Sequence, residues 1–250
     1  MNLFITQGRT GLQSKFDTFR SRIELTQKQK EQISGSHKHL RNRCLSSLTY
    51  VDETFLTGSY IKNTMIRPPD DVDVFVEVKY TRMDSPNTVL NRLKKDLKNH
   101  YSSTIKKDRP CVILDFSHCK FELTPFFINY YTLYIPNDSL SGWVSVPHPN
   151  DSAKELTAAN NKHGGKLVPL IKMMKQCARK NNIACKSYEL EQKAIYSLAY
   201  FNGFRDGVMQ LLRIYDWTHN NYSQLQIQYM TDDQFATFCR NELFGSDFPT

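Results

Sequence analysis

The stretch TGSYIKNTMIRPPDDVDVFVEV, residues 57–78, carries two carboxylates inside an apolar run that is typical of a buried strand. Side chains at positions i and i+2 of a strand point to the same face, so we expect Asp71 and Asp73 to project together. Two adjacent carboxylates repel each other, and partial burial would raise their pKa values. A divalent cation removes this repulsion, and all-oxygen ligands favour Mg²⁺ or Mn²⁺. The pattern therefore predicts a metal site on this strand.

A turn is the alternative interpretation of the same residues. Two prolines precede the aspartates, and such a sequence favours an Asx turn or a cap at the edge of a strand. This interpretation explains Asp70 well, but it explains Asp73 poorly because valines flank that residue on both sides.

Gly58 and Ser59 lie just upstream of the aspartates. A glycine lets backbone N–H groups approach an anion closely, and a helical turn that follows it would point its N-terminus at that anion. The serine hydroxyl adds one further contact. We therefore expect Gly58 and Ser59 to bind a phosphate group.

The composition is that of an ordinary globular protein, with 250 residues, 40% of them hydrophobic and 23% charged. The net charge of +8 favours anionic partners such as nucleotides, nucleic acid or an acidic membrane surface. No stretch approaches the roughly 20 apolar residues of a membrane helix, and the N-terminus lacks the layout of a signal peptide. The six cysteines form no C-x-x-C pair, which favours reduced thiols. We therefore expect a cytoplasmic protein that does not bind a membrane.

The chain shows two kinds of pattern in succession. Residues 10–48 have a polar helical pattern, in which Thr26 is a candidate cap for a second helix. Further on, we expect a helical turn over 60–65, a helix from Ser85-Pro86 to about Tyr101, and strands over 49–56, 72–78, 111–116 and 120–129. From about Ala153 the pattern is helical. We expect an α+β fold in which residues 1–150 form a mixed β-sheet flanked by helices, packed on a helical lobe of residues 151–250.

The spacing of Gly58-Ser59 and Asp71-x-Asp73 resembles the signature of the DNA polymerase β-like nucleotidyltransferases. More narrowly, GSYIKNTMIRPPDDVDVFV looks like the bacterial cyclic-oligonucleotide synthases of anti-phage systems, the CD-NTases, which are relatives of oligoadenylate synthetase and cyclic GMP-AMP synthase. In that family the two acids bind two Mg²⁺ ions and a nucleoside triphosphate, and a third acid on a later strand activates the attacking hydroxyl. The resemblance thus implies a nucleotidyltransferase lobe in which Asp71 and Asp73 are catalytic metal ligands.

The family's third acid lies in a strand of the form Phe-Asp-apolar-x-Pro-x-Phe. The segment FELTPFF, residues 121–127, resembles that strand with Glu122 in the place of the aspartate. Glutamate is one methylene longer, so the metal would have to sit slightly differently. Asp115, in the neighbouring run VILDF, is the rival for this role, and an edge or turn carboxylate is its alternative interpretation. The resemblance implies that Glu122 completes the catalytic and metal-binding set.

Two segments of the helical lobe also resemble the family. LVPLIKMMKQC is similar to a helix whose last lysine contacts the triphosphate, which implies substrate-binding roles for Lys172 and Lys175. From their spacing alone, two lysines one turn apart would be expected to be solvated. KSYELE is similar to a motif in which the serine binds phosphate and the tyrosine stacks on a base, which implies such roles for Ser187 and Tyr188. A buried core tyrosine is the alternative for Tyr188.

The resemblance as a whole implies an enzyme of bacterial anti-phage defence. It would use two Mg²⁺ or Mn²⁺ ions to make a cyclic di- or trinucleotide from NTPs, ATP among them, with release of pyrophosphate. The alternatives are a linear oligoadenylate synthetase or another nucleotidyltransferase acting on a small substrate or tRNA. In another class, a basic nucleic-acid-binding module with a degenerate site is possible. Because no close histidine joins Cys177 and Cys185 in a zinc site, we expect activity without an obligatory nucleic-acid activator.

Overall fold

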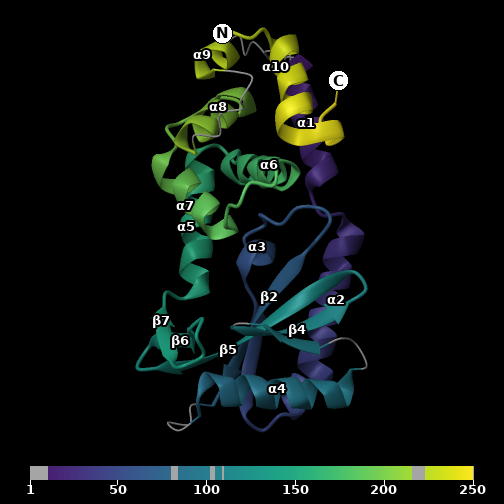
Figure 1. Ribbon diagram of the computed structural model, residues 1–250, viewed down its shortest axis with the longest axis vertical. Helices are drawn as coiled ribbons and strands as arrows, with labels where there is room; N and C mark the ends of the chain where they lie inside the picture. The colour runs from purple at the N-terminus through teal and green to yellow at the C-terminus, as the bar shows by residue number, and fades with distance from the viewer. Residues whose placement is uncertain (1–10, 80–83, 102–104, 109, 216–222, 250) are drawn as a thin grey trace, which may run out of the picture. The chain divides into compact units, whose positions relative to one another are not determined.

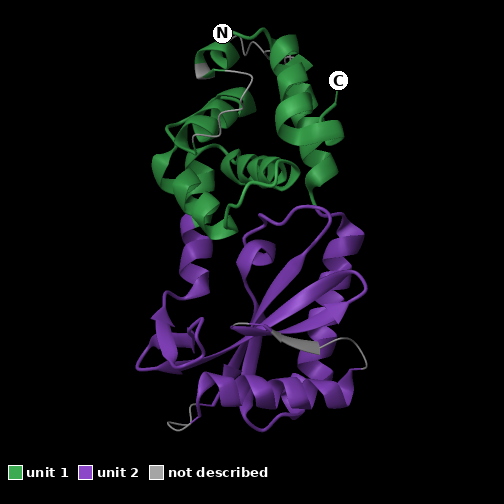
Figure 2. Ribbon diagram, viewed as in Figure 1, with its two compact units in different colours: residues 1–24, 156–250 green, residues 25–155 purple. Residues whose placement is uncertain are grey.

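The computed structural model describes residues 11–79, 84–101, 105–108, 110–215 and 223–249. The chain divides into two compact units (Figure 2). Residues 25–155 form what we call the sheet unit, and residues 1–24 together with 156–250 form the helical unit. The expected α+β fold with a mixed sheet is confirmed.

The sheet unit contains the β-sheet together with α2 and α4 (Figure 1). Its strands lie in the order β1-β2-β5-β4-β3, and β6 and β7 continue the pairing from the last part of β5. The β2–β5 pair is parallel and the other pairs are antiparallel. The elements are α2 Gln27–Arg43, β1 Val51–Leu56, α3 Gly58–Ile61, β2 Asp71–Val78, α4 Pro86–His100, β3 Ile105–Asp108, β4 Cys111–Phe116, β5 Cys119–Asn129, β6 Thr132–Pro136 and β7 Trp143–Val146, with a short 3₁₀ turn, Leu45–Ser47, before β1.

The two long helices of the sheet unit, α2 and α4, begin where the sequence predicts. Thr26 caps α2 through a capping box with Gln29, in which each side chain accepts a hydrogen bond from the other residue's backbone N–H. Ser85 caps α4, and Pro86 occupies the first turn, where its missing N–H costs no helical hydrogen bond. The first strand begins at Val51, slightly later than expected, and the helical turn that follows it begins at Gly58 rather than at residue 60.

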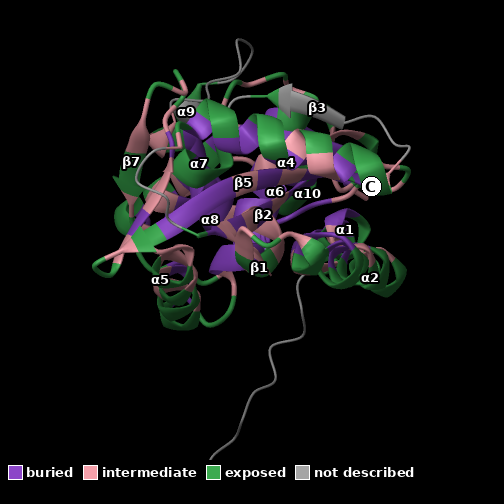
Figure 3. Ribbon diagram, turned by 90° about the horizontal axis from the view of Figure 1, so that it is seen from below, coloured by how far each residue is buried: buried purple, intermediate pink, exposed green. Residues whose placement is uncertain are grey.

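Burial alternates along β2, as the period of a strand requires. Val72, Val74 and Val76 are buried in one cluster with apolar residues of α2, α4, β4 and β5. Asp71 and Asp73 point to the opposite face, which we call the acid face. Figure 3 shows the buried stretches of β2 and β5 at the centre of the sheet. The core of the sheet unit therefore fixes which side chains the acid face presents.

The helical unit is built around buried phenylalanines. Phe19 of α1 lies 4.6 Å from Phe244 between ring centroids, and Phe16 lies 5.1 Å from Phe248. The elements are α1 Gly11–Ile23, α5 Pro149–Lys162, which begins in the sheet unit, α6 Leu167–Lys180, α7 Ser187–Ser197, α8 Phe204–Ile214, α9 Gln224–Gln228, α10 Asp232–Phe238, a π-helical turn Cys239–Phe244 and a 3₁₀ turn Gly245–Asp247.

The grouping of α1 differs from the sequence-based division. We expected the helices of residues 10–48 to belong together to the first lobe, but α1 is part of the helical unit. The physical reason is its apolar face, on which Leu12, Phe16, Phe19 and Ile23 are all buried and which meets C-terminal aromatic rings. Thr10 of that expected helical segment lies outside the described residues, and so do residues 216–219 of the helical pattern expected from about Ala153. None of the described helices has the length and apolar character needed to cross a membrane.

Candidate active site

The Gly58 turn lies directly against one of the predicted metal ligands. The backbone N–H of Thr57 donates to the carbonyl oxygen of Asp73 at 2.9 Å, so the end of β1 is bound to β2 at this point. Gly58 has a φ of 62°, in the left-handed region. A Cβ atom at this position would lie 1.7 Å from Oδ2 of Asp73. Only glycine therefore allows the turn and the Asp73 carboxylate to occupy these positions together.

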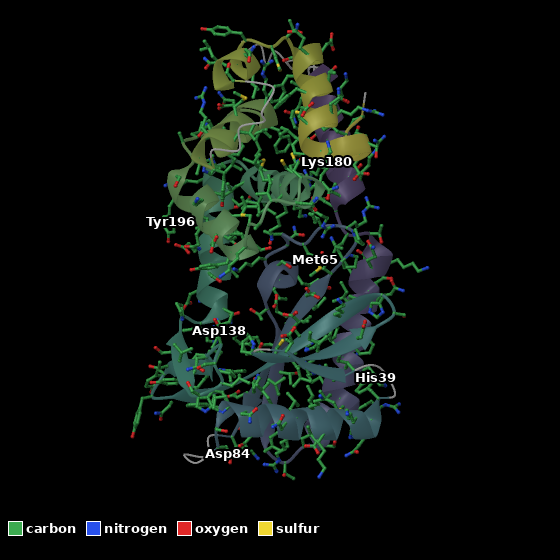
Figure 4. All side chains as sticks on the ribbon, in the orientation of Figure 1. His39, Met65, Asp84, Asp138, Lys180 and Tyr196 are labelled. Atoms are coloured by element: carbon green, nitrogen blue, oxygen red, sulfur yellow. The ribbon has the colours of Figure 1, made fainter. Side chains whose placement is uncertain are left out.

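Backbone hydrogen bonds also hold the next residue of the turn. The carbonyl oxygen of Ser59 accepts from the N–H groups of Thr64 at 2.9 Å and Met65 at 3.1 Å. Met65 is buried and lies beside α3 (Figure 4). These bonds close the short α3 segment onto the chain that leads into β2, so Gly58 and Ser59 keep a fixed position next to the aspartates.

The parallel pairing of β2 with β5 brings the third acid to the first two. The register places Asp73 opposite Glu122 and Asp71 opposite Lys120. Phe121 and Leu123 are buried in the core cluster, so Glu122 between them points to the acid face. Asp115 of β4 lies opposite Lys120, one strand further from the aspartate pair. The geometry thus makes Glu122, rather than Asp115, the direct neighbour of Asp73.

The electrostatic state of Glu122 reflects this crowding. Burial and the negative charges of Asp71, Asp73 and Asp108 raise the pKa of Glu122 from 4.5 to about 7, although the ammonium of Lys120 acts in the opposite direction. Carboxylates that raise one another's pKa in a partly buried place are typical of metal and catalytic sites. The negative charges of the two aspartates therefore act on Glu122 across the acid face.

The acid face has the donor chemistry of a site for hard cations. The side chains of Asp71, Asp73 and Glu122 all offer carboxylate oxygens, the ligands that Mg²⁺ and Mn²⁺ prefer. Among the described residues, no three Asp, Glu, His or Cys side chains are gathered closely enough to form a finished ligand set. Ion binding would therefore need side-chain rotations. The three carboxylates share one face, and the aspartates raise the pKa of Glu122, which fits a site for such ions. In their present rotamers, however, the carboxylates do not form a closed site.

The helical unit contains the two predicted substrate-binding lysines, and both are ion-paired. Lys172 is only 2% exposed, and its Nζ lies 3.0 Å from Oε1 of Glu24. The Nζ of Lys175 lies 3.1 Å from Oε1 of Glu191, and the two side chains are 10% and 4% exposed. The expectation of solvated lysines, which came from spacing alone, is therefore wrong. Both pairs fix α6 to neighbouring parts of the helical unit.

The two remaining predicted residues begin α7. Ser187 is its first residue, and no side chain caps this end of the helix in the described part of the chain. Tyr188 is 57% exposed, so the alternative of a core tyrosine is wrong. An exposed serine and tyrosine at a helix N-terminus have the chemistry to bind a phosphate and a base.

Two charged residues next to the predicted ones were not recognised as neighbours of the site before the structure was known. Lys120 precedes Glu122 by two residues in a strand, and this period alone would have placed it on the same face. Glu191 is the partner of Lys175, but the two belong to different helices, and no sequence spacing indicates their contact.

Comparison with known families identifies the kind of protein to which this arrangement belongs. Residues 11–160 match the model of the SMODS family, the Second Messenger Oligonucleotide or Dinucleotide Synthetase domain. The chain belongs to the SMODS family. The match covers both segments that carry the proposed acids, and the expected relationship to the CD-NTases is confirmed.

Individual relatives agree with this SMODS assignment. The chain is 28% identical over 137 residues to a cyclic AMP-AMP-AMP synthase of an Acinetobacter species, in a match that covers 51% of this chain and 40% of that enzyme's length. The fold is similar to that of Escherichia coli MS115-1 CdnC with ATP, at a TM-score of 0.72, 15% identity and coverage of 95% and 99% of the two chains. It is also similar to Vibrio cholerae DncV cyclic AMP-GMP synthase with a linear intermediate, at a TM-score of 0.63, 12% identity and coverage of 79% and 77%.

Proposed function

We propose that this SMODS-family protein is a metal-dependent nucleotidyltransferase that joins NTPs into a cyclic di- or trinucleotide and releases pyrophosphate. One observation carries the proposal: Asp71, Asp73 and Glu122 share the acid face, directly beside a Gly58 turn that only glycine can form. A role in bacterial anti-phage defence is part of the same proposal, and it rests on the family resemblance.

The chemistry of the proposed site follows from the positions of its acids. Asp71, Asp73 and Glu122 would be the ligands of two Mg²⁺ or Mn²⁺ ions. When bound, such ions neutralise charge on the attacking and leaving oxygens of an in-line transfer at the α-phosphate. Glu122, on the strand beside Asp73, would orient the attacking ribose hydroxyl and favour loss of its proton.

Binding of the triphosphate would use groups from different parts of the sequence. Gly58 and Ser59 offer backbone N–H groups at the start of α3. The family resemblance assigns contacts with the phosphates to Lys175 and Ser187 and stacking on a base to Tyr188, and we retain these roles as proposals. Lys172, which we had also expected to bind substrate, is better suited to holding α6 in place, because it is buried against Glu24.

ATP is the first substrate to test, because the curated relative is a cyclic AMP-AMP-AMP synthase. The purified protein would be incubated with each NTP and with their mixtures, with Mg²⁺ or Mn²⁺, and the products identified by mass spectrometry. We expect pyrophosphate release and a product that resists phosphatase because it has no free phosphate end. A phosphatase-sensitive linear product would contradict cyclisation, and no pyrophosphate from any mixture would contradict the nucleotidyltransferase itself.

A nucleic-acid-binding module is the alternative of another class, and its test concerns polymer dependence. We expect nuclease-treated protein to release pyrophosphate without added duplex, and neutralisation of Lys38, Arg41 and Arg43 on α2 to leave turnover unchanged. If duplex DNA or RNA were required, those residues would control activity and turnover would fall steeply with salt. Strict dependence on duplex would overturn the expectation of a synthase without a nucleic-acid activator.

A further inference from the structure

Lys120 stands at the edge of the proposed site without a role in it. It lies at the start of β5, is exposed, and is opposite Asp71 on one side and Asp115 on the other. Its backbone N–H donates to the carbonyl oxygen of Asp70 at 3.1 Å, which fixes this position of the strand next to the start of β2. A lysine is therefore held on the acid face, two residues before Glu122 on the same strand.

The strand order assigns this lysine to one side of the site. The Gly58 turn follows β1, which lies on one side of β2, and β5 with Lys120 lies on the other side. The Gly58 turn is the proposed place of the donor triphosphate, whose α-phosphate is attacked. Glu122, the proposed partner of the attacking hydroxyl, is on β5 with Lys120. The two sides of β2 thus separate donor from acceptor, and Lys120 is on the acceptor side.

A cation on that side would offset the charge that the acceptor brings. An acceptor NTP brings several negative charges toward a face that already holds Asp71, Asp73 and Glu122, with Asp108 close enough to affect the pKa of Glu122. Residues i and i+2 of a strand are about 6.6 Å apart, and a lysine stem spans a comparable distance. Its ammonium, with three donors, can therefore reach a phosphate of a nucleotide whose ribose is at Glu122.

We propose that Lys120 binds a phosphate group of the acceptor nucleotide and so selects a nucleoside triphosphate, rather than an unphosphorylated nucleoside, as the attacking molecule. The inference rests on the proposed function and adds to it a residue that distinguishes the two nucleotide positions. After the first transfer the linear intermediate keeps its 5′-triphosphate, and ring closure requires this group to move from Lys120 to the donor position at the Gly58 turn, where its α-phosphate is attacked and pyrophosphate leaves.

The test separates donor from acceptor with a 2′,3′-dideoxynucleoside triphosphate. This molecule can donate its nucleotidyl group but cannot attack, so a labelled dideoxy donor and a ribonucleotide acceptor report one transfer in one direction. The acceptor is supplied either as the 5′-triphosphate or as the unphosphorylated ribonucleoside. The variants are Lys120→Met, Lys120→Arg and, as a control, Lys98→Met, which removes an exposed lysine of α4. Thermal melting checks that each variant is folded.

We expect Lys120→Met to raise the KM for the acceptor triphosphate about tenfold, the lower end of the effect of a charge-assisted hydrogen bond. The KM for the ribonucleoside acceptor and the Kd of the dideoxy donor should stay unchanged. Lys120→Arg should restore most of the preference for the triphosphate, and Lys98→Met should behave as wild type.

Three results would overturn the inference while leaving the proposed function intact. They are an unchanged KM in Lys120→Met, an equal loss with both acceptors, which would indicate a purely structural or general electrostatic role, and a weaker Kd for the dideoxy donor, which would place Lys120 on the donor side. If the wild-type protein forms no bond with any donor and acceptor, the proposed function fails and the inference fails with it.

Discussion

Replacement of Glu122 by glutamine should stabilise the metal-free protein at neutral and alkaline pH, although it removes a proposed catalytic group. Burial and the neighbouring aspartates raise the pKa of Glu122 from 4.5 to about 7. Below pH 4.5 the carboxyl is protonated in both the folded and the unfolded chain, and the substitution should have little effect there. Between these two values the unfolded chain loses this proton while the folded chain keeps it, so the free energy of unfolding falls as the pH rises.

The size of the effect follows from the two pKa values. At about 1.4 kcal/mol for each tenfold change in the dissociation constant, the upper limit is about 3 kcal/mol. Glu122 is only partly buried, so solvent screening should reduce the measurable gain in Glu122→Gln to about 1–2 kcal/mol at pH 8. Urea unfolding of both proteins in EDTA, from pH 4.5 to pH 8.5, measures this difference directly.

Added Mg²⁺ should reverse the order of stability. An ion that binds the folded chain stabilises it by mass action, and wild type should gain more than Glu122→Gln because glutamine lacks the negative charge. Glu122→Gln should also lose several orders of magnitude in turnover while NTP binding persists. A variant that is no more stable than wild type at pH 8 in EDTA, or a gain that is the same at pH 4.5, would refute the reasoning from carboxylate repulsion.

Three further variants test other parts of the molecule. Asp71→Asn combined with Asp73→Asn should abolish pyrophosphate release from NTPs and leave the far-UV circular dichroism unchanged; wild-type turnover would exclude the metal site. Gly58→Ala should lower turnover at least a hundredfold, roughly the cost of misplacing a reacting group, because its Cβ would displace the Asp73 carboxylate; measured kcat near wild type would show that the turn can move. Phe19→Ala should cost about 3–5 kcal/mol in urea unfolding, because that ring is fully buried; a loss below about 1 kcal/mol would contradict its place in the core.

The sequence predicted local structure well because local rules determine it. The caps at Thr26 and Ser85 and the alternation along residues 72–78 follow from hydrogen-bonding and period rules within a few residues. The choice between Glu122 and Asp115 could not be made in this way. It depends on the parallel register of β2 and β5, which is set by long-range packing of their buried faces.

The lysines of the helical unit show the same limit. Their spacing placed Lys172 and Lys175 on one helix, but it did not reveal that each would be paired with a carboxylate from outside that helix. The membership of α1 in the helical unit is a second example, because the segments that complete its core lie more than two hundred residues away, around Phe244 and Phe248. The sequence indicated only a polar helical pattern over residues 10–48, and it revealed neither the buried face of α1 nor the partner of that face.

The parallel pairing of β2 with β5 also has a consequence for folding. Each of the hairpins β3–β4 and β4–β5 can form from neighbouring sequence, but Asp73 meets Glu122 only after the chain between them has been ordered. Contacts of such high sequence separation form slowly because the loop entropy must be lost first. The acids therefore come together in one of the later steps of folding, together with the packing of the buried β2 valines against β5. A nascent or partly folded chain would hold its aspartates and its glutamate apart, so the proposed metal site would not exist before the fold is complete.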